Sequence, residues 1–135
     1  MKSLIKFITA FIVMLSVAAP SFAQKKTFDG KKIKEVKEWK VEGSKRYLVE
    51  VSKFDANGKK TEEIKYNSDG SQKERVTFEY NAEGKCVSEL KYDEYNKLDK
   101  KTVTEYNAQG KRIKETSYNA SGKLKSIKEI EYITE

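Results

Sequence analysis

The sequence predicts an all-β protein, an open antiparallel β-meander of about eight strands, and three observations support this prediction. A six-residue turn motif, YNAEGK at residues 80–85, recurs in near copies to the end of the chain. The aromatic residues that open these copies, followed by Tyr132, are separated by alternating steps of 12 and 14 residues, which defines a 26-residue double-hairpin repeat. No stretch has helical periodicity, and Pro20, the only proline, lies near the N-terminus.

The turn motif explains why the chain reverses at each copy. Asn or Asp at the second residue can accept a hydrogen bond from the backbone two residues on, and Gly at the fifth adopts the left-handed conformation of a bulge. In one copy Asn96 replaces Gly, and Asn tolerates a positive φ. Counting a degenerate copy at residues 39–44, six of the seven glycines occupy this position. The other copies are residues 54–59, 66–71, 92–97, 106–111 and 118–123.

The N-terminus has the pattern of a secretory signal peptide. Lys2 and Lys6 precede an apolar run of 13 residues, 7–19, and the small-x-small sequence at residues 21–23 follows it. A run of 13 is shorter than the roughly 20 residues that span a bilayer, which argues against a transmembrane anchor. We therefore expect residues 1–23 to be removed and the protein to be periplasmic or secreted.

Residues 24–135 have the length of a single domain. They keep 26 basic and 21 acidic residues, a net charge of +5, and the two signs alternate along the predicted strands. Interleaved charge is typical of a solvated face rather than of the basic patch that binds nucleic acid, so we expect no nucleic-acid partner. Cys86 is the only cysteine, so the domain has no internal disulfide and depends on its sheet.

The strands follow the turns in order. Residues 24–32 are polar, and residues 31–39 and 45–54 form the first predicted hairpin, in which residues 47–51 are the strongest β stretch of the chain. The later predicted strands are residues 59–66, 71–80, 85–92, 97–106, 111–118 and 123–132.

The turn geometry also predicts a register. A three-residue loop with a glycine bulge places Tyr80 opposite Cys86, and an unbroken ladder then places Phe78 opposite Ser88. Even-numbered residues of all strands would then share one aromatic and aliphatic face. Trp39 breaks this parity, so the first hairpin either buries the other face or contains a bulge. The even face collects the residues of a candidate ligand-binding face: Tyr66, Phe78, Tyr80, Tyr92, Tyr106, Tyr118 and Tyr132.

The predicted aromatic face is not a closed core. Lys60, Glu62 and Lys100 fall on it between the tyrosines, and fully buried charges would each need a partner. This pattern favours an open, twisted sheet with a partly solvated face over a closed barrel. An open sheet has two edges that can pair with another chain, so we expect a homo-oligomer or strand addition to be accessible.

The residue types argue against an enzyme. The chain has no histidine, so neither the commonest general base nor a Cys-His nucleophile pair is present. Glu62 and Glu74 are the nearest to a candidate acid pair, and pairing with neighbouring lysines is the favoured interpretation. No loop has the dense oxygen-ligand spacing of a calcium site. We therefore predict no catalytic residues, no metal and no cofactor.

The repeated tyrosines allow two interpretations. Aromatic rings beside Lys, Arg and Asn could stack on sugar rings or bind a polyanionic polymer. Alternatively, a tyrosine before each turn packs on the adjacent strand and closes the hairpin. We favour the structural interpretation, because a residue repeated at every turn is first explained by what every turn needs.

Residues 78–85, FEYNAEGK, resemble the YD (Rhs-type) repeat, whose consensus is aromatic-x-Tyr-Asp-x-x-Gly-Arg. The resemblance covers roughly residues 39–132 and implies successive hairpins. YD repeats in large Rhs proteins wind into shells, and some have been linked to carbohydrate binding. A signal peptide followed by about a hundred residues of such hairpins looks like the small secreted proteins of unknown function from gut Gram-negative anaerobes.

Together these features predict an exported, non-enzymatic binding or interaction module of the cell envelope or extracellular space. A glycan or an envelope protein is the expected partner. The alternative is a purely structural or self-assembling β-sheet protein.

Overall fold

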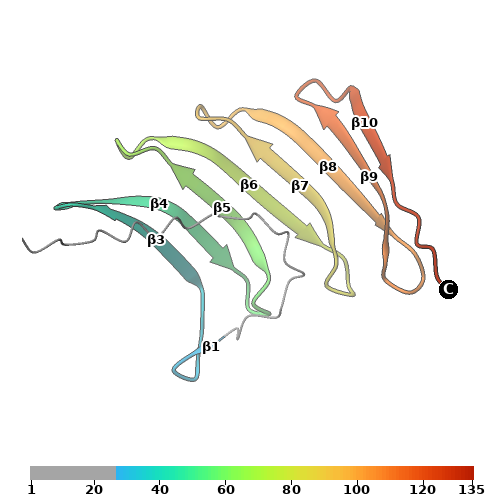
Figure 1. Cartoon of the computed structure of the whole chain (residues 1–135), viewed down its shortest axis with the longest axis horizontal. Coiled ribbons are helices and arrows are strands. Elements are labelled where there is room, and N and C mark those ends of the chain that lie inside the picture. Colours follow the sequence, from blue (N-terminus) through green and yellow to red (C-terminus); the bar gives the residue numbers. More distant parts are fainter. Residues whose placement is uncertain (1–26) are drawn as a thin grey trace, which may run out of the picture.

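The computed structural model describes residues 27–135, and every regular element in this part of the chain is a β-strand (Figure 1). The predicted signal peptide, residues 1–23, lies outside the described residues. No helix that could cross a membrane occurs between residues 27 and 135.

Eight strands form one antiparallel sheet in chain order, from β3 at one edge to β10 at the other (Figure 1). A small hairpin, β1–β2, precedes it. The predicted open meander is therefore confirmed. The strands are β1 (Thr27–Phe28), β2 (Lys31–Lys32), β3 (Glu35–Glu42), β4 (Lys45–Phe54), β5 (Lys60–Tyr66), β6 (Gln72–Tyr80), β7 (Cys86–Tyr92), β8 (Leu98–Tyr106), β9 (Arg112–Asn119) and β10 (Leu124–Glu129).

The repeated turns have the predicted geometry. The Asn81 side-chain oxygen accepts the N–H groups of Glu83 and Lys85, at 3.1 and 2.9 Å, and the Gly84 N–H closes the turn on the Asn81 carbonyl at 2.9 Å. Asn96 has the expected positive φ, 64°. Gly84 has φ 74°, a conformation that favours glycine, and a Cβ there would displace only the flexible end of the Lys59 side chain, 3.1 Å away.

The β3–β4 turn differs from the prediction. Glu42 lies opposite Lys45, so the loop has two residues, and Gly43 is its first residue, with φ 60°. Gly43 therefore does not occupy the bulge position of the repeated motif. A two-residue hairpin loop needs glycine at its first position when only that residue has a positive φ. The first predicted strand, residues 31–39, is likewise divided between β2 and β3.

The predicted register is correct at the turn and wrong beyond it. Tyr80 lies opposite Cys86, but Phe78 lies opposite Glu89, because Val87 is left over as a bulge. The same one-residue shift follows each turn from β4 to β10. A given face of the sheet therefore holds even-numbered residues of one strand and odd-numbered residues of the next. The extra residues are Thr61, Lys73, Val87, Asp99, Ile113 and Lys125.

The repeated bulges divide the predicted aromatic face between the two faces of the sheet. We name the two faces after one tyrosine each. Register and alternation place Ile64, Tyr66, Arg75, Leu90, Tyr92, Val103 and Tyr118 on the Tyr92 face. They place Glu63, Lys65, Glu74, Val76, Phe78, Tyr80, Lys91 and Tyr106 on the Tyr80 face. The prediction of a single aromatic face is therefore wrong.

The first hairpin contains a bulge, which was one of the two explanations for the odd position of Trp39. The β3–β4 register shifts between Glu38 and Trp39, and Val49 is the extra residue. Trp39 consequently lies on the Tyr92 face, where the guanidinium of Arg46 stacks 4.3 Å from the centre of its ring.

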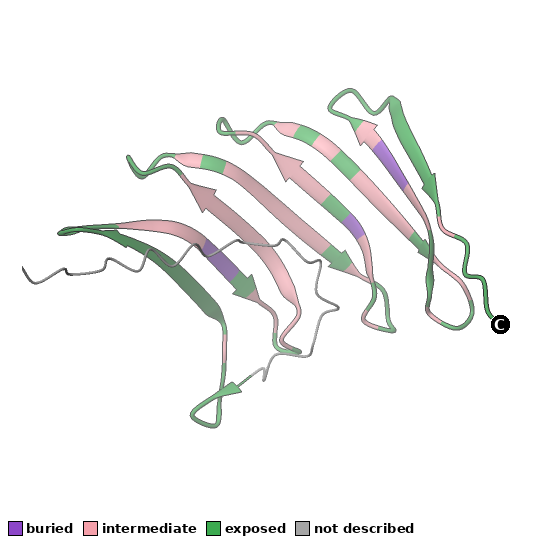
Figure 2. Ribbon diagram, in the orientation of Figure 1, coloured by how far each residue is buried: buried purple, intermediate pink, exposed green. Residues whose placement is uncertain are grey.

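The described part of the chain has no enclosed hydrophobic core. Val51, 6% exposed, is its only buried apolar residue, and the other buried residues are small and polar, such as Ser88 and Thr116. The interior strands are mostly half-buried, whereas β3 and β10 are exposed throughout (Figure 2). Short side chains are buried because the long side chains beside them on the same face cover them. No second layer formed by residues 27–135 covers either face of the sheet.

Candidate functional site

Three of the predicted site residues are tied to the backbone through their hydroxyl groups. The Tyr80 hydroxyl donates to the Lys60 carbonyl at 2.7 Å, and the Tyr106 hydroxyl donates to the Cys86 carbonyl at 2.6 Å. Tyr132 makes the equivalent bond to Arg112 at 2.9 Å. We call these three residues the Tyr80 set.

Each of these bonds has the same structural reason. The accepting carbonyl belongs to the residue directly before an extra residue of the ladder, as Lys60 comes before Thr61. A bulge interrupts the strand pairing, and the tyrosine hydroxyl of the next strand supplies a donor at that point. Burial raises the pKa of Tyr80 to about 12, and nearby Cys86 adds to the effect. The Tyr80 set therefore serves the fold, as the structural interpretation of the repeat predicts.

The other three tyrosines lie on the Tyr92 face, and we call Tyr66, Tyr92 and Tyr118 the Tyr92 set. They lie at the C-terminal ends of β5, β7 and β9, all at the same end of the sheet, and all three are half-buried. None donates a hydroxyl hydrogen bond within residues 27–135. The hydroxyl groups of the Tyr92 set are thus available to a ligand.

Cationic and polar side chains lie beside Tyr92. The Arg75 guanidinium stacks 4.0 Å from the centre of the Tyr92 ring, and its Nε donates to the Asn96 side-chain oxygen at 2.9 Å. The Gln72 amide donates to the Asp93 carbonyl at 2.8 Å. Sequence reasoning missed Arg75, because only the bulged register places it directly opposite Tyr92.

The Tyr80 face carries a network of ion pairs. Glu74 lies between Lys65 and Lys91, with N–O distances of 2.9 and 2.7 Å, and Lys65 also reaches Glu63 at 3.6 Å. Hydrogen bonds from the two lysines lower the pKa of Glu74 to about 2. Phe78, another predicted site residue, lies on this face two residues from Tyr80.

The candidate acid pair is separated by the sheet. Glu74 lies on the Tyr80 face, whereas Glu62 lies opposite Thr77 on the Tyr92 face and pairs with Lys53 at 3.5 Å. The favoured interpretation, pairing with lysines, is confirmed for both residues. Within residues 27–135 no group of three or more His, Cys, Asp or Glu side chains is arranged to hold a metal ion.

Cys86 lies beside the Tyr80 set. Its side chain is half-buried, and burial, the main cause, raises the pKa of its thiol. A thiol that is largely protonated is a poor nucleophile. Packing against Tyr80, its partner across the strands, is therefore the role that the geometry supports.

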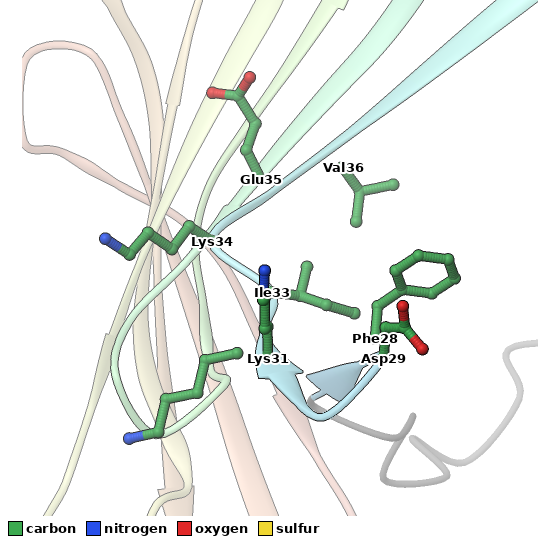
Figure 3. Close-up of a pocket in the computed structure, with 8 residues that line it drawn as sticks. Phe28, Asp29, Lys31, Ile33, Lys34, Glu35 and Val36 are labelled. Atoms are coloured by element: carbon green, nitrogen blue, oxygen red, sulfur yellow. The ribbon is translucent and has the colours of Figure 1, made fainter.

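A hollow of about 710 Å³ lies where the β1–β2 hairpin meets the start of β3. Figure 3 shows Phe28, Ile33 and Val36 on one side of the chain, with the Lys34 side chain directed away from them. The Phe28 side chain is 78% exposed. Phe28 followed by an Asp-Gly turn is a local signal for a hairpin, but nothing in the sequence predicts the hollow.

Comparisons with known proteins give weak likenesses. No family model and no curated protein matches the chain. One similar structure is a GtfA/B complex bound to UDP and GlcNAc, with a TM-score of 0.29 and 14% identity over 69% of this chain and 19% of that chain. Another is a protein of unknown function, BF3112, from Bacteroides fragilis NCTC 9343, with a TM-score of 0.26 and 18% identity over 72% of this chain and 92% of that chain. The chain thus spans about a fifth of the first structure, and neither score is high enough to assign a function.

Proposed function

We propose that this chain is an exported, non-enzymatic interaction module that binds an extended glycan across its Tyr92 face. One observation carries the proposal: half-buried tyrosine rings recur at the ends of alternate strands, on a face that no second layer formed by residues 27–135 covers. Alternate strands of a sheet lie roughly 10 Å apart, a spacing similar to the repeat of an extended disaccharide. Successive rings would stack on successive sugar units.

Polar groups beside the rings suit a sugar ligand. Arg75 lies opposite Tyr92, and Lys101 lies opposite Tyr118, so two of the three rings have a cationic side chain directly across the strands, and Tyr66 has the polar Gln72. Guanidinium and ammonium groups donate hydrogen bonds to sugar hydroxyls and attract acidic sugars. The tyrosine hydroxyls of the Tyr92 set can both donate and accept.

Two sequence features support the same proposal. The N-terminal pattern supports export to the periplasm or the extracellular space. The turn motif resembles YD repeats, some of which have been linked to carbohydrate binding. The separation of Glu62 from Glu74 by the sheet supports a non-enzymatic role, because two carboxylates on opposite faces cannot act on one bond.

A glycan array probed with the purified protein tests the proposal. We expect selective retention on an extended glycan and at least a tenfold loss of affinity for a variant with Tyr92→Leu and Tyr118→Leu, about the effect of two lost ring contacts. Phe78→Leu is the matched control, because it removes an aromatic ring from the Tyr80 face and should leave affinity unchanged. No binding to any glycan on the array, or equal binding by both variants, would contradict the proposal.

The second candidate function is a purely structural, self-assembling sheet. The exposure of every residue of β3 and β10 favours it, because strand edges of this kind can pair with further strands. Assembly without any retained glycan would favour this function.

A further inference from the structure

The two edges of the sheet complement one another. We propose that β10 of one copy pairs antiparallel with β3 of a second copy, with Lys128 opposite Glu38, so that copies join head to tail into a longer sheet. The inference goes beyond glycan binding and does not depend on it. Because the eight strands alternate in direction, β3 and β10 are antiparallel, and copies placed side by side continue the meander.

Backbone geometry determines which residues of β10 can form new hydrogen bonds. The Ile130 N–H donates to the Ile113 carbonyl at 2.9 Å, so residues at even positions of β10 bond to β9. Hydrogen bonding alternates along an antiparallel strand. The N–H and C=O groups of Ile127 and Glu129 therefore point to the free edge.

The same argument applies to β3. The Phe54 N–H donates to the Lys34 carbonyl at 2.9 Å, so even positions of β3 bond to β4. Lys37 and Trp39 therefore point their backbone groups to the free edge. The two free edges can form a regular ladder only when these odd-numbered residues face one another.

One register satisfies the ladder and the side chains together. It places lysine opposite glutamate twice, once on each face of the sheet, and apolar opposite apolar twice. Sliding by two residues one way puts Lys128 opposite Lys40, and sliding the other way puts Glu129 opposite Glu35. The pairs in the proposed register are Ile127 with Trp39, Lys128 with Glu38, Glu129 with Lys37 and Ile130 with Val36.

The charges at the edges are incompletely matched within one copy. Glu38 lies directly opposite Glu50, and Glu38 has no ion pair within residues 27–135. Lys128 reaches Glu115 at only 3.8 Å. A neighbouring Lys128 would relieve the repulsion between the two glutamates.

The exposed apolar residues at the edges also find partners in this register. Trp39 and Ile127 are 44% and 50% exposed and would pack together on the Tyr92 face. Continuing the pairing brings Ile133, 90% exposed, opposite Ile33 at the hollow beside Phe28 (Figure 3). The C-terminal end of β10 and the β1–β2 hairpin lie at the same end of the sheet (Figure 1).

Cysteine cross-linking tests the register. Lys128 and Glu38 would form a non-hydrogen-bonded pair with Cα atoms about 4.5 Å apart, within reach of a disulfide. We expect Lys128→Cys with Glu38→Cys, in a Cys86→Ser background, to give a ladder of disulfide-linked multimers on oxidation. Lys128→Cys with Lys37→Cys, whose side chains would lie on opposite faces, should give far less. Equal ladders from both variants, or none from either, would overturn the proposal.

Sedimentation of charge variants tests the attraction. Glu38→Lys should raise the dissociation constant about tenfold, since a favourable pair becomes a repulsive one, and adding Lys128→Glu should restore it. Tyr92→Leu should leave assembly unchanged, which separates this proposal from glycan binding. A chain that is monomeric at every concentration, or a double variant no better than the single one, would refute head-to-tail pairing.

Discussion

The Tyr80 set and the Tyr92 set occupy equivalent places in the two halves of the repeat, yet their environments differ. Tyr80 and Tyr106 come before one series of turns and donate their hydroxyls to carbonyls of the adjacent strand. Tyr66, Tyr92 and Tyr118 come before the other series, on the opposite face, and make no such bond within the described part of the chain. One sequence motif thus bonds its tyrosine hydroxyls to the backbone on one face and leaves the hydroxyls unbonded on the other.

Phe54 strengthens this comparison. It stands at the position of the repeat that Tyr80 occupies 26 residues later, and it has no hydroxyl to donate. An aromatic ring thus occupies this position in every repeat, whereas the hydroxyl is an additional stabilising group in the later repeats. Separate substitutions of ring and hydroxyl can distinguish the two contributions.

The largest expected effect is a loss of unfolding free energy when a tyrosine of either set is replaced by leucine. Tyr106→Leu should lower the free energy of unfolding by roughly 2 kcal/mol, because it removes both a half-buried ring and the donor to the Cys86 carbonyl. Tyr92→Leu should cost about 1 kcal/mol, since it loses a ring and the stacked Arg75 but no hydroxyl bond. Chemical denaturation of both variants measures this, and equal losses would show that the two sets are equivalent.

The next difference is a dependence on alkaline pH. The folded pKa of Tyr80, about 12, lies above the ordinary tyrosine value of 10. A raised pKa stabilises the fold below pH 10, and this stability is lost as pH rises from 10 towards 12. After allowance for solvent screening the loss should be about 1 kcal/mol. Thermal unfolding from pH 8 to 12 should show a smaller decline for Tyr80→Phe than for Tyr92→Phe. Identical pH profiles for these two variants would be evidence against the assignment to Tyr80.

The smallest expected effect concerns the stacked pair on the Tyr92 face. A double-mutant cycle with Arg75→Gln and Tyr92→Leu should give a coupling of about 0.5–1 kcal/mol in the free energy of unfolding. Lys101→Gln with Tyr118→Leu is the matched cycle one repeat later, where no cation from residues 27–135 stacks on the Tyr118 ring. Equal coupling in the two cycles would show that the Arg75 stack contributes nothing specific.

The sequence predicted the hairpins well because each turn is encoded locally. Asn81 and Gly84 supply the hydrogen bonds and the positive φ that close their turn, and both requirements are visible in six consecutive residues. The strand bounds therefore agree with the prediction to about one residue from β5 to β9, whereas β10 ends at Glu129 and not at residue 132. The assignment of faces failed, because the bulge residues include the β-branched Val87 and the charged Asp99 and Lys125, so no single residue type indicates an unpaired position.

The sequence by itself determined the repeat, the turns and the antiparallel meander, since these depend on short-range backbone preferences. Only the tertiary structure decided which side chains share a face, because one unpaired residue per turn reverses the alternation of every strand that follows. It therefore decided that Arg75 meets Tyr92 and that Glu62 and Glu74 lie apart. The complementarity of β3 and β10 has the same origin: it depends on which backbone groups remain unpaired after eight strands have formed.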